Sequence, residues 1–298
     1  MTRRRVTVLT KSDCLSAGEI GGAIAEALSS RHMEATVEPV GPDLDLHLRR
    51  VKPSIAFMAL EEHSPWASRT LGLLELLGVP STGSSNLTSS LCRDKSKTLR
   101  LLGAGGLPVP AHVVVHKDYI DDTPVHLSGL SCPIEVSSAI AGEQAIRVTR
   151  PESLASATHA ALSNGPRAIA FEVPTARRLS GFVLDQTFLG AVETTPNGRD
   201  QIAPLSPTLA SHVARMSRQA HQTMDCMGLA EIEFLVSDLH PISVLGVLPN
   251  PSLAPKGRAA LAASNAGISY KQLICDLTEQ AFRIPNSQKR QGTGRGVA

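Results

Sequence analysis

The sequence predicts an α/β protein of two or three lobes, the first of which is a doubly wound parallel sheet. The chain of 298 residues is too long for one small core, because single cores usually stop growing at about 250 to 300 residues. Stretches with strand and helix periodicity alternate near the N-terminus, which is typical of a parallel sheet covered by helices. Later stretches are richer in strands, which indicates separate α+β lobes.

The first lobe is expected to span residues 1–93. Its predicted elements are strands at 5–10, 34–40 and 54–60 and helices at 19–31 and 69–78. Ligands of such sheets lie beyond the carboxyl ends of the strands, which here means residues 10–18 and 60–68. Residues 82–93 are rich in Ser and Thr and are interpreted as a connection to the next helix.

A small middle lobe is expected over residues 94–165, and a third lobe over 166–284. The middle lobe has predicted helices at 94–104 and 151–163 and strands at 111–116, 132–137 and 144–149. The third has predicted strands at 167–172, 181–189, 230–236 and 241–247 and helices at 207–227 and 269–282. Residues 285–298 have no apolar periodicity, so a disordered tail is expected there.

Composition narrows the classes of function. A formal net charge of +2, with basic clusters only near the chain ends, gives no field that would recruit nucleic acid. No run approaches the roughly 18 to 20 apolar residues of a membrane span, and no signal peptide is recognised, so a cytoplasmic protein is expected. Five scattered cysteines without a CxxC pair argue against a disulfide framework and against a zinc site.

Four segments stand in the order and at the spacing of one known family. They are GLLELLGVPSTGSS (72–85), RDKSKTLRLLGAGGLPVPAHVVV (93–115), MGLAEIEFLV (227–236) and VLGVLPNPSLAP (244–255). Together they resemble the D-alanine:D-alanine ligase branch of the ATP-grasp superfamily. The resemblance implies the ATP-grasp fold, with ATP between the middle and last lobes and amino-acid or carboxylate substrates near the first lobe. It also implies formation of an acyl phosphate that an amine attacks, which needs cations at the phosphates and carboxylates at magnesium.

The phosphate-binding positions implied by the resemblance are mostly changed. In the family's DKxxxK helix, Asp94 and Lys95 match the start, and Leu99 stands at the second lysine. Lys97 lies two residues away, which turns its side chain by about 200° around the helix. Lys95 and Lys97 are the candidate nucleotide contacts, although Lys95 is also interpreted as an exposed or helix-start lysine. Ser137 replaces the lysine of the family's VxVKP strand.

The nucleotide and metal positions show the same trend. Glu172 matches an acidic residue on the adenine side, and Leu179 aligns with a residue that usually holds the ribose. The family's RxD motif becomes Glu231-Ile232-Glu233, which leaves Glu233 as a single candidate metal ligand. The bridging carboxylate and the amide of the next metal motif become Gly246 and Leu248.

The first lobe and the lid differ too. Asp13 occupies an acidic position in the first loop, and Glu61, Glu62 and His63 follow the third strand. Asp13, Glu61 and His63 are the candidate catalytic residues if the cleft performs ATP-independent chemistry, since a His between acids can act as a base. Residues 192–203 replace the family's long lid loop, and the lid is expected to be missing or much shortened.

The leading hypothesis is a degenerate ligase-family protein that does not perform magnesium-ATP-dependent ligation and has no cofactor. It would be retained as a binding or partner protein, as a homodimer or in a heterodimer with an active ligase. One alternative is an amide-forming ligase that uses ATP and magnesium with rearranged residues. The other is an ATP-independent enzyme acting at the first lobe. A small amino acid or carboxylate is the ligand class implied.

Overall fold

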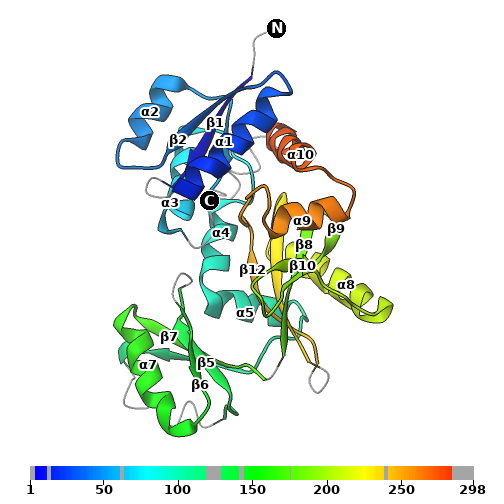
Figure 1. Ribbon diagram of the computed structural model, residues 1–298. Helices are drawn as coiled ribbons and strands as arrows, with labels where there is room; N and C mark the ends of the chain where they lie inside the picture. Colours follow the sequence, from blue (N-terminus) through cyan, green and yellow to red (C-terminus); the bar gives the residue numbers. More distant parts are fainter. Residues whose placement is uncertain are drawn as a thin grey trace, which may run out of the picture.

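Three sheets and their covering helices make up the protein. The computed structural model describes residues 4–11, 15–60, 64–118, 129–140, 144–174, 176–237 and 241–283. One sheet lies in each of the three parts seen in Figure 1, with the N-terminal lobe at the top and the middle lobe at the lower left. The mixture of a parallel sheet with two antiparallel sheets confirms the predicted fold class.

The N-terminal lobe is a parallel sheet of strand order β2-β1-β3. Its elements are β1 (Arg5–Thr10), α1 (Leu15–Ser29), β2 (Glu34–Pro39), α2 (Leu44–Val51), β3 (Ile55–Met58) and α3 (Pro65–Leu77). Helix α3 begins where the hydroxyl of Ser64 accepts a hydrogen bond from the Trp66 N–H, and it ends at Gly78 with φ of 67°. Helix α2 was not predicted, because it is short and buries only Leu44 and Leu48.

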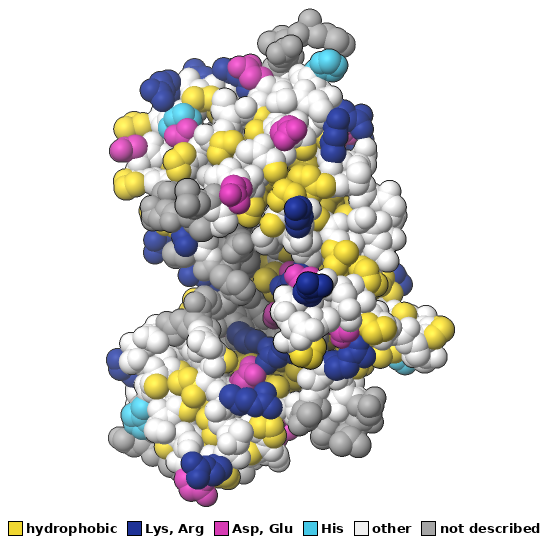
Figure 2. Space-filling model, viewed as in Figure 1, with side chains coloured by type: hydrophobic (Ala, Val, Ile, Leu, Met, Phe, Trp, Pro, Cys, Tyr) yellow, Lys and Arg dark blue, Asp and Glu magenta, His cyan; other side chains and the backbone are white. Residues whose placement is uncertain are grey.

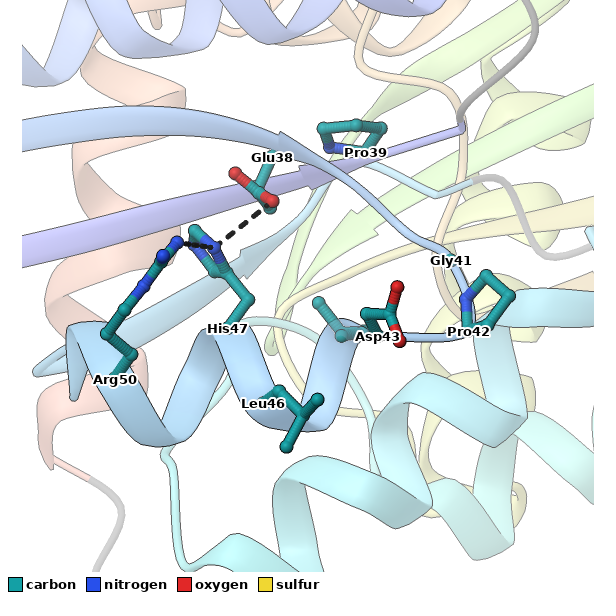
Figure 3. A pocket seen from close by; sticks show the side chains of 9 residues that line it. Glu38, Pro39, Gly41, Pro42, Asp43, Leu46, His47 and Arg50 are labelled. Atoms are coloured by element: carbon teal, nitrogen blue, oxygen red, sulfur yellow. Dashed lines mark hydrogen bonds and ion pairs between the residues drawn. The ribbon is translucent and has the colours of Figure 1, made fainter.

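A pocket of about 430 Å³ lies in the N-terminal lobe between the end of β2 and α2. Figure 3 shows Glu38, His47 and Arg50 gathered on one side of it. The His47 Nδ1 atom lies 3.3 Å from Glu38 Oε1 and 3.2 Å from Arg50 Nη2. This pocket is lined by residues 38–50 alone, so it is separate from the interlobe cleft described below.

Two consecutive helices connect the N-terminal lobe to the rest. The predicted irregular connection at 82–93 is wrong in part, since α4 (Asn86–Arg93) occupies most of it and is followed by α5 (Lys95–Ala104). Ser85 caps α4 by accepting the N–H of Thr88, and Asp94 caps α5 by accepting the N–H of Lys97. Ser and Thr usually favour caps and turns, so the burial of Thr88 against the rest of the molecule decided this helix.

The middle lobe is an antiparallel sheet of order β4-β7-β5-β6 with one covering helix. Its elements are β4 (His112–His116), β5 (Ile134–Ser138), β6 (Ile146–Val148), a 3₁₀ turn η2 (Pro151–Ser153), α7 (Leu154–Ser163) and β7 (Arg167–Glu172). The predicted strands and helix of this lobe are confirmed within a few residues. Its core lies between α7 and β5, where Leu154 and Leu162 pack against Ile134 and Val136.

The last lobe is an antiparallel sheet of order β10-β9-β8-β11-β12. Its elements are β8 (Arg177–Leu184), β9 (Thr187–Thr194), β10 (Asp200–Ile202), α8 (Pro207–Thr223), β11 (Leu229–Val236), β12 (Ser243–Leu248), α9 (Arg258–Asn265) and α10 (Tyr270–Arg283). The single strand predicted at 181–189 is wrong, because the chain reverses at Asp185, whose φ is 55°. Gly and Asn mark such turns most clearly, and neither residue is present here.

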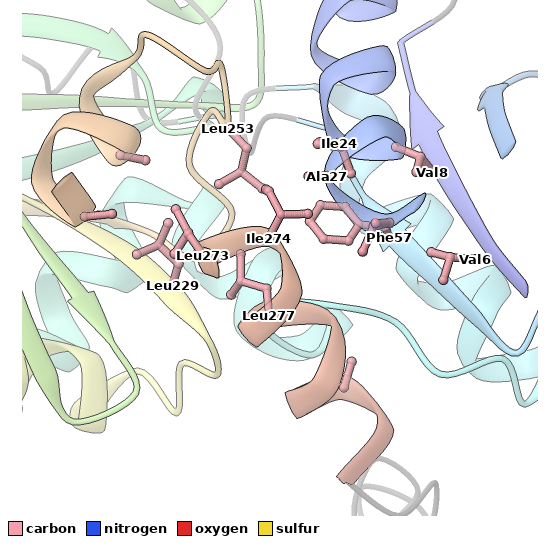
Figure 4. Packing of buried hydrophobic residues seen from close by; sticks show 14 of the residues in the cluster. Val6, Val8, Ile24, Ala27, Phe57, Leu229, Leu253, Leu273, Ile274 and Leu277 are labelled. Carbon is pink, nitrogen blue, oxygen red and sulfur yellow. The ribbon is translucent and has the colours of Figure 1, made fainter. Parts of the chain in front are cut away.

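Helices cover both faces of this last sheet. Val213, Met216 and Ala220 of α8 pack on one face, and α9 and α10 lie on the other. Figure 4 shows Ile274 of α10 directed toward Phe57 of β3, so the C-terminal helix also packs against the N-terminal lobe. The first and last lobes thus share one apolar core, whereas the middle lobe has a core of its own.

A hollow separates the middle lobe from the rest of the molecule, and Lys and Arg side chains gather along it (Figure 2). In the part of the chain that the structure describes, no helix is long and apolar enough to cross a membrane.

Candidate functional site in the interlobe cleft

The α9-side face of the last sheet carries a strip of polar side chains. Arg178 and Ser180 alternate on β8, and Glu231 and Glu233 alternate on β11. Glu233 is paired with Ser180, and residues paired across antiparallel strands point to the same face of a sheet. The strip is flanked by Phe182 at one end and by the apolar contact with the middle lobe at the other. The four side chains therefore lie on the sheet surface that borders the cleft.

Glu231 is the most buried member of the strip and has two partners. Its Oε1 atom accepts a hydrogen bond from Ser180 Oγ at 2.7 Å and forms an ion pair with Arg258 Nη2 at 2.7 Å. Arg258 Nη1 also donates to Ser180 Oγ at 3.1 Å, which closes a ring of three groups. Burial raises the pKa of the Glu231 carboxyl, although Arg258 and Ser180 lower it, and Glu233 raises it further.

Arg258 is a site residue that the sequence analysis missed. It is the first residue of α9 and comes 27 positions after Glu231, so no local spacing links the two. The available signal was Glu231 itself, since an acid in an otherwise apolar strand requires a buried partner. Glu231, which stands at the arginine of the family's RxD motif, is thus in contact with an arginine that α9 supplies.

Glu233 has room on one side and no partner among the described residues. Its Oε2 atom lies 3.1 Å from the place where a Cβ atom at Gly246, its partner on β12, would stand. The strand register shifts next to Glu233, and Leu245 enters the apolar contact with the middle lobe there. Glu233 therefore faces the place where the resemblance implied a second carboxylate, and glycine supplies none.

Lys95 lies opposite this strip, at the first position of α5. Its ammonium group lies 4.6 Å from the centre of the Phe171 ring on β7. Burial lowers the pKa of Lys95, the carboxylates of Glu233 and Glu135 raise it, and Arg178 lowers it. Lys95 therefore shares an electrostatic environment with the strip. It stands at the start of α5, as the helix-start interpretation predicted, but its side chain is half-buried and not exposed.

The other residues of α5 point elsewhere. Lys97 is exposed, and only its backbone N–H has a recorded contact, with Asp94. Leu99 is fully buried in the apolar cluster that joins the middle and last lobes, together with Phe171 and Leu235. Position 99 lies inside a closed apolar contact. Leu99 therefore brings no polar group to the cleft, and Lys95 is the cationic side chain of α5 that borders it.

The predicted nucleotide-side residues are differently placed. Glu172, at the end of β7, accepts a 2.6 Å hydrogen bond from the backbone N–H of Ser131. Leu179 is buried on the opposite face of the sheet, in the core with α8. Its neighbour Arg178 faces the cleft instead and forms an ion pair with Glu135 of the middle lobe at 2.5 Å. This ion pair connects the two lobes across the cleft.

Asp94 fixes the position of Lys95. Arg167 Nη2 donates to Asp94 Oδ2 at 2.6 Å, and Ser96 Oγ donates to Asp94 Oδ1 at 2.6 Å. Burial raises the pKa of Asp94, but the hydrogen bonds from Ser96, Arg167 and the Lys97 backbone outweigh it, so the pKa is lowered. This network attaches the start of α5 to the middle sheet.

The described residues do not fit a magnesium site. Magnesium needs several oxygen ligands in near-octahedral geometry. Glu231 is engaged by Arg258 and Ser180, position 246 is glycine, and position 248 is leucine. No group of three or more His, Cys, Asp or Glu residues that could hold a metal occurs in the described ranges. Of the positions that the resemblance assigned to metal, Glu233 alone still carries a carboxylate without a recorded hydrogen bond or ion pair among the described residues.

The predicted lid region is a tight hairpin. β9 and β10 pair as neighbours, and Pro196, Asn197 and Gly198 form the turn, with Gly198 at φ of 75°. This agrees with the expected shortening. Asp13, Glu61 and His63 lie outside the described residues, so their predicted role stays a prediction. Trp66 packs on the core of the N-terminal lobe with Leu71 and Leu74.

The fold and the cleft between two antiparallel lobes define the ATP-grasp class. A D-alanine--D-alanine ligase from Bacillus anthracis complexed with ATP superposes with a TM-score of 0.84, at 18% identity, covering 98% of this chain and all of that one. A D-Ala:D-Ser ligase from Enterococcus faecalis gives a TM-score of 0.80 at 15% identity, covering 94% of this chain and all of that one.

Sequence relatives place the chain within that class. The D-alanine--D-alanine ligase of Gloeobacter violaceus is 29% identical, covering 93% of this chain and 99% of its own length. That of Parvibaculum lavamentivorans is 28% identical, covering 88% and 91%. No family model matches the chain. The chain is thus similar to D-alanine--D-alanine ligases in sequence along nearly its whole length, and it has the ATP-grasp fold of their solved structures.

Proposed function

We propose that this protein binds a small molecule in the interlobe cleft and does not carry out magnesium-ATP-dependent ligation. The observation that carries the proposal is the isolation of Glu233. Its neighbour on β12 is Gly246, and the other acid on its strand, Glu231, already has Arg258 and Ser180 as partners. A pair of magnesium ions bridging phosphates would need more oxygen ligands than one carboxylate supplies.

The phosphate side of the cleft supports the same proposal. Lys95 is a cation in a suitable place, but Ser137 stands where the resemblance implied a second lysine. A missing charge-assisted contact weakens binding by about 1.5 to 3 kcal/mol. The short hairpin at 194–200 also gives the cleft less cover against water than a long loop would.

Calorimetry with ATP tests the proposal directly. We expect the protein to bind ATP weakly, with no gain in affinity when magnesium is added, and to release no ADP in the presence of D-alanine. Tight magnesium-dependent binding followed by ADP release would overturn the proposal. It would support instead an amide-forming ligase, an alternative favoured by the position of Lys95 beside Phe171 in the cleft.

A restored metal site offers a sharper form of this test. Replacing Gly246→Asp and Leu248→Asn would add two oxygen ligands beside Glu233, at the cost of a small shift, because a Cβ at 246 stands 3.1 Å from Glu233 Oε2. The double variant is expected to bind Mn²⁺ at least about tenfold more tightly than the parent, measured by the loss of the free-ion EPR signal. Equal binding in both proteins would show that the metal ligands lie elsewhere.

Assembly and location belong to the same proposal. We place the protein in the cytoplasm, as a homodimer or as a partner of an active ligase, and size-exclusion chromatography with light scattering measures that state. ATP-independent chemistry involving Asp13, Glu61 and His63 stays a second candidate from the sequence. No described contact favours it.

A further inference from the structure

One recorded ion pair joins the middle lobe to the last lobe among the residues that the structure describes. Arg178 Nη2, at the start of β8, lies 2.5 Å from Glu135 Oε1 on β5. Apolar packing joins the same two lobes around Leu99 and Phe171, beside the connection from β7 to β8. The two lobes are therefore held together by apolar side chains near that connection and by opposite charges next to it.

Glu135 lies on the cleft face of the middle sheet. Its neighbours on β5, Ile134 and Val136, are buried in the core with α7, and successive side chains of a strand alternate between the two faces. Across the sheet, Glu135 is paired with Phe171 on one side and with Arg147 on the other. From the apolar contact outward, the row facing the last lobe therefore consists of Phe171, Glu135 and Arg147.

Three cations surround Glu135. The guanidinium groups of Arg178 and Arg147 approach the same oxygen, Oε1, at 2.5 and 3.8 Å. Lys95 of α5 is close enough for the Glu135 carboxylate to raise its pKa and for Arg178 to lower it. The Glu135 side chain is only 12% exposed, so water screens these interactions incompletely. Glu135 thus stands between Arg178 of the last lobe and like charges on the other side of the cleft.

We propose that Glu135 is a charge latch: it holds the middle lobe against the last lobe before any ligand binds, by attracting Arg178 and by offsetting its repulsion from Arg147 and Lys95. Dissolved salt should weaken the latch, because it screens charges on exposed groups. The latch shifts the population of closed molecules and does not lock them, since Arg178 is 51% exposed. It acts without ligand, so it does not depend on the proposed function.

The distance between the two lobes measures the latch. Spin labels are attached to ketone-bearing residues incorporated at the exposed positions 152, in the middle lobe, and 215, on α8, so that the native cysteines stay unmodified. Pulsed EPR then gives the distribution of label distances in the full chain without ligand or metal. When NaCl is raised from about 0.05 M to about 1 M, the population at longer distances should rise about two- to fivefold in the parent.

Substitutions on the two sides of the ion pair should respond differently to salt. Glu135→Gln removes the attraction and leaves Arg178 facing Arg147 and Lys95, so longer distances should be more populated than in the parent at low salt. Added salt screens this repulsion, and the longer distances should then decrease. Arg178→Gln removes the attraction and the repulsion together, so its distribution should be intermediate at low salt and should not change with salt.

Two further variants are matched controls. Arg147→Gln breaks a contact within the middle lobe and should leave the lobes as close as in the parent. Glu193→Gln frees Arg177, the neighbour of Arg178, from an ion pair within the last lobe, and it should also leave the distribution unchanged. Urea denaturation verifies that every labelled variant is folded.

Three outcomes would overturn the latch. The first is a Glu135→Gln distribution equal to that of the parent at low salt. The second is a response to salt in the same direction in both proteins. The third is an opening in Arg147→Gln as large as that in Glu135→Gln, which would show that Glu135 acts only within the middle lobe.

Discussion

Asp94 and Glu231 are both buried carboxylates that contact one serine and one arginine, and they stand on either side of the same cleft. Asp94 contacts Ser96 and Arg167, and Glu231 contacts Ser180 and Arg258. Their pKa values nevertheless move in opposite directions, downward for Asp94 and upward for Glu231.

The surroundings explain the difference. Burial raises the pKa of both groups, but Asp94 accepts an additional hydrogen bond from the Lys97 backbone N–H, and its contacts outweigh burial. Glu231 is more deeply buried, at 3% exposure, and Glu233 adds a second negative charge nearby. The Asp94 network therefore stabilises the fold, whereas the Glu231 network holds charge in an unfavourable place, as functional sites often do.

Removal of Arg167 gives the largest expected effect. Arg167→Ala leaves the Asp94 carboxylate buried without its cation, and we expect the free energy of unfolding to fall by about 3 kcal/mol in urea denaturation at neutral pH. Arg177→Ala is the control, because its ion pair with Glu193 leaves the arginine 45% exposed and should contribute less than about 1 kcal/mol. Equal losses would remove the distinction between a structural network and a surface ion pair.

Lowering the pH should remove the contribution of Asp94 to the free energy of unfolding. Its pKa is lower in the folded chain than the ordinary value of 3.8, so the stabilisation is complete above that pH and is lost as the pH falls through the folded value. Asp94→Asn should therefore lose about 2 kcal/mol at pH 7, and the gap from the parent should close below pH 3.8. A gap that is constant down to pH 3 would show that the hydrogen bonds act without the charge.

The contribution of Glu231 to the free energy of unfolding should change with pH in the opposite direction, and by a smaller amount. Its folded pKa lies above the ordinary value of 4.5, so stability present below that pH is lost as the pH rises through the folded value. Glu231→Gln does not titrate, and we expect it to unfold within about 1 kcal/mol of the parent at pH 7 and to gain relative to it with rising pH. A loss as large as that of Arg167→Ala would make the two networks equivalent.

Local sequence patterns predicted many of the helices and strands of this protein. The alternation of strands and helices predicted the parallel lobe, and a few ordered segments carried the resemblance to the ligase family. The hairpin at Asp185 and the helix at Asn86–Arg93 were not recognised. A positive φ at an aspartate and the burial of Thr88 depend on distant contacts that a local window does not contain.

The candidate site also has features that the sequence determined and features that only the fold determined. The substitutions at positions 137, 231, 246 and 248 follow from the sequence, because a glycine or leucine cannot ligate a metal wherever it lies. Only the tertiary structure brought Arg258 onto Glu231, directed Lys95 toward the cleft and turned Leu99 away from it. Side-chain chemistry belongs to each residue by itself, whereas charge balance depends on which elements pack together, and that is decided by the whole fold.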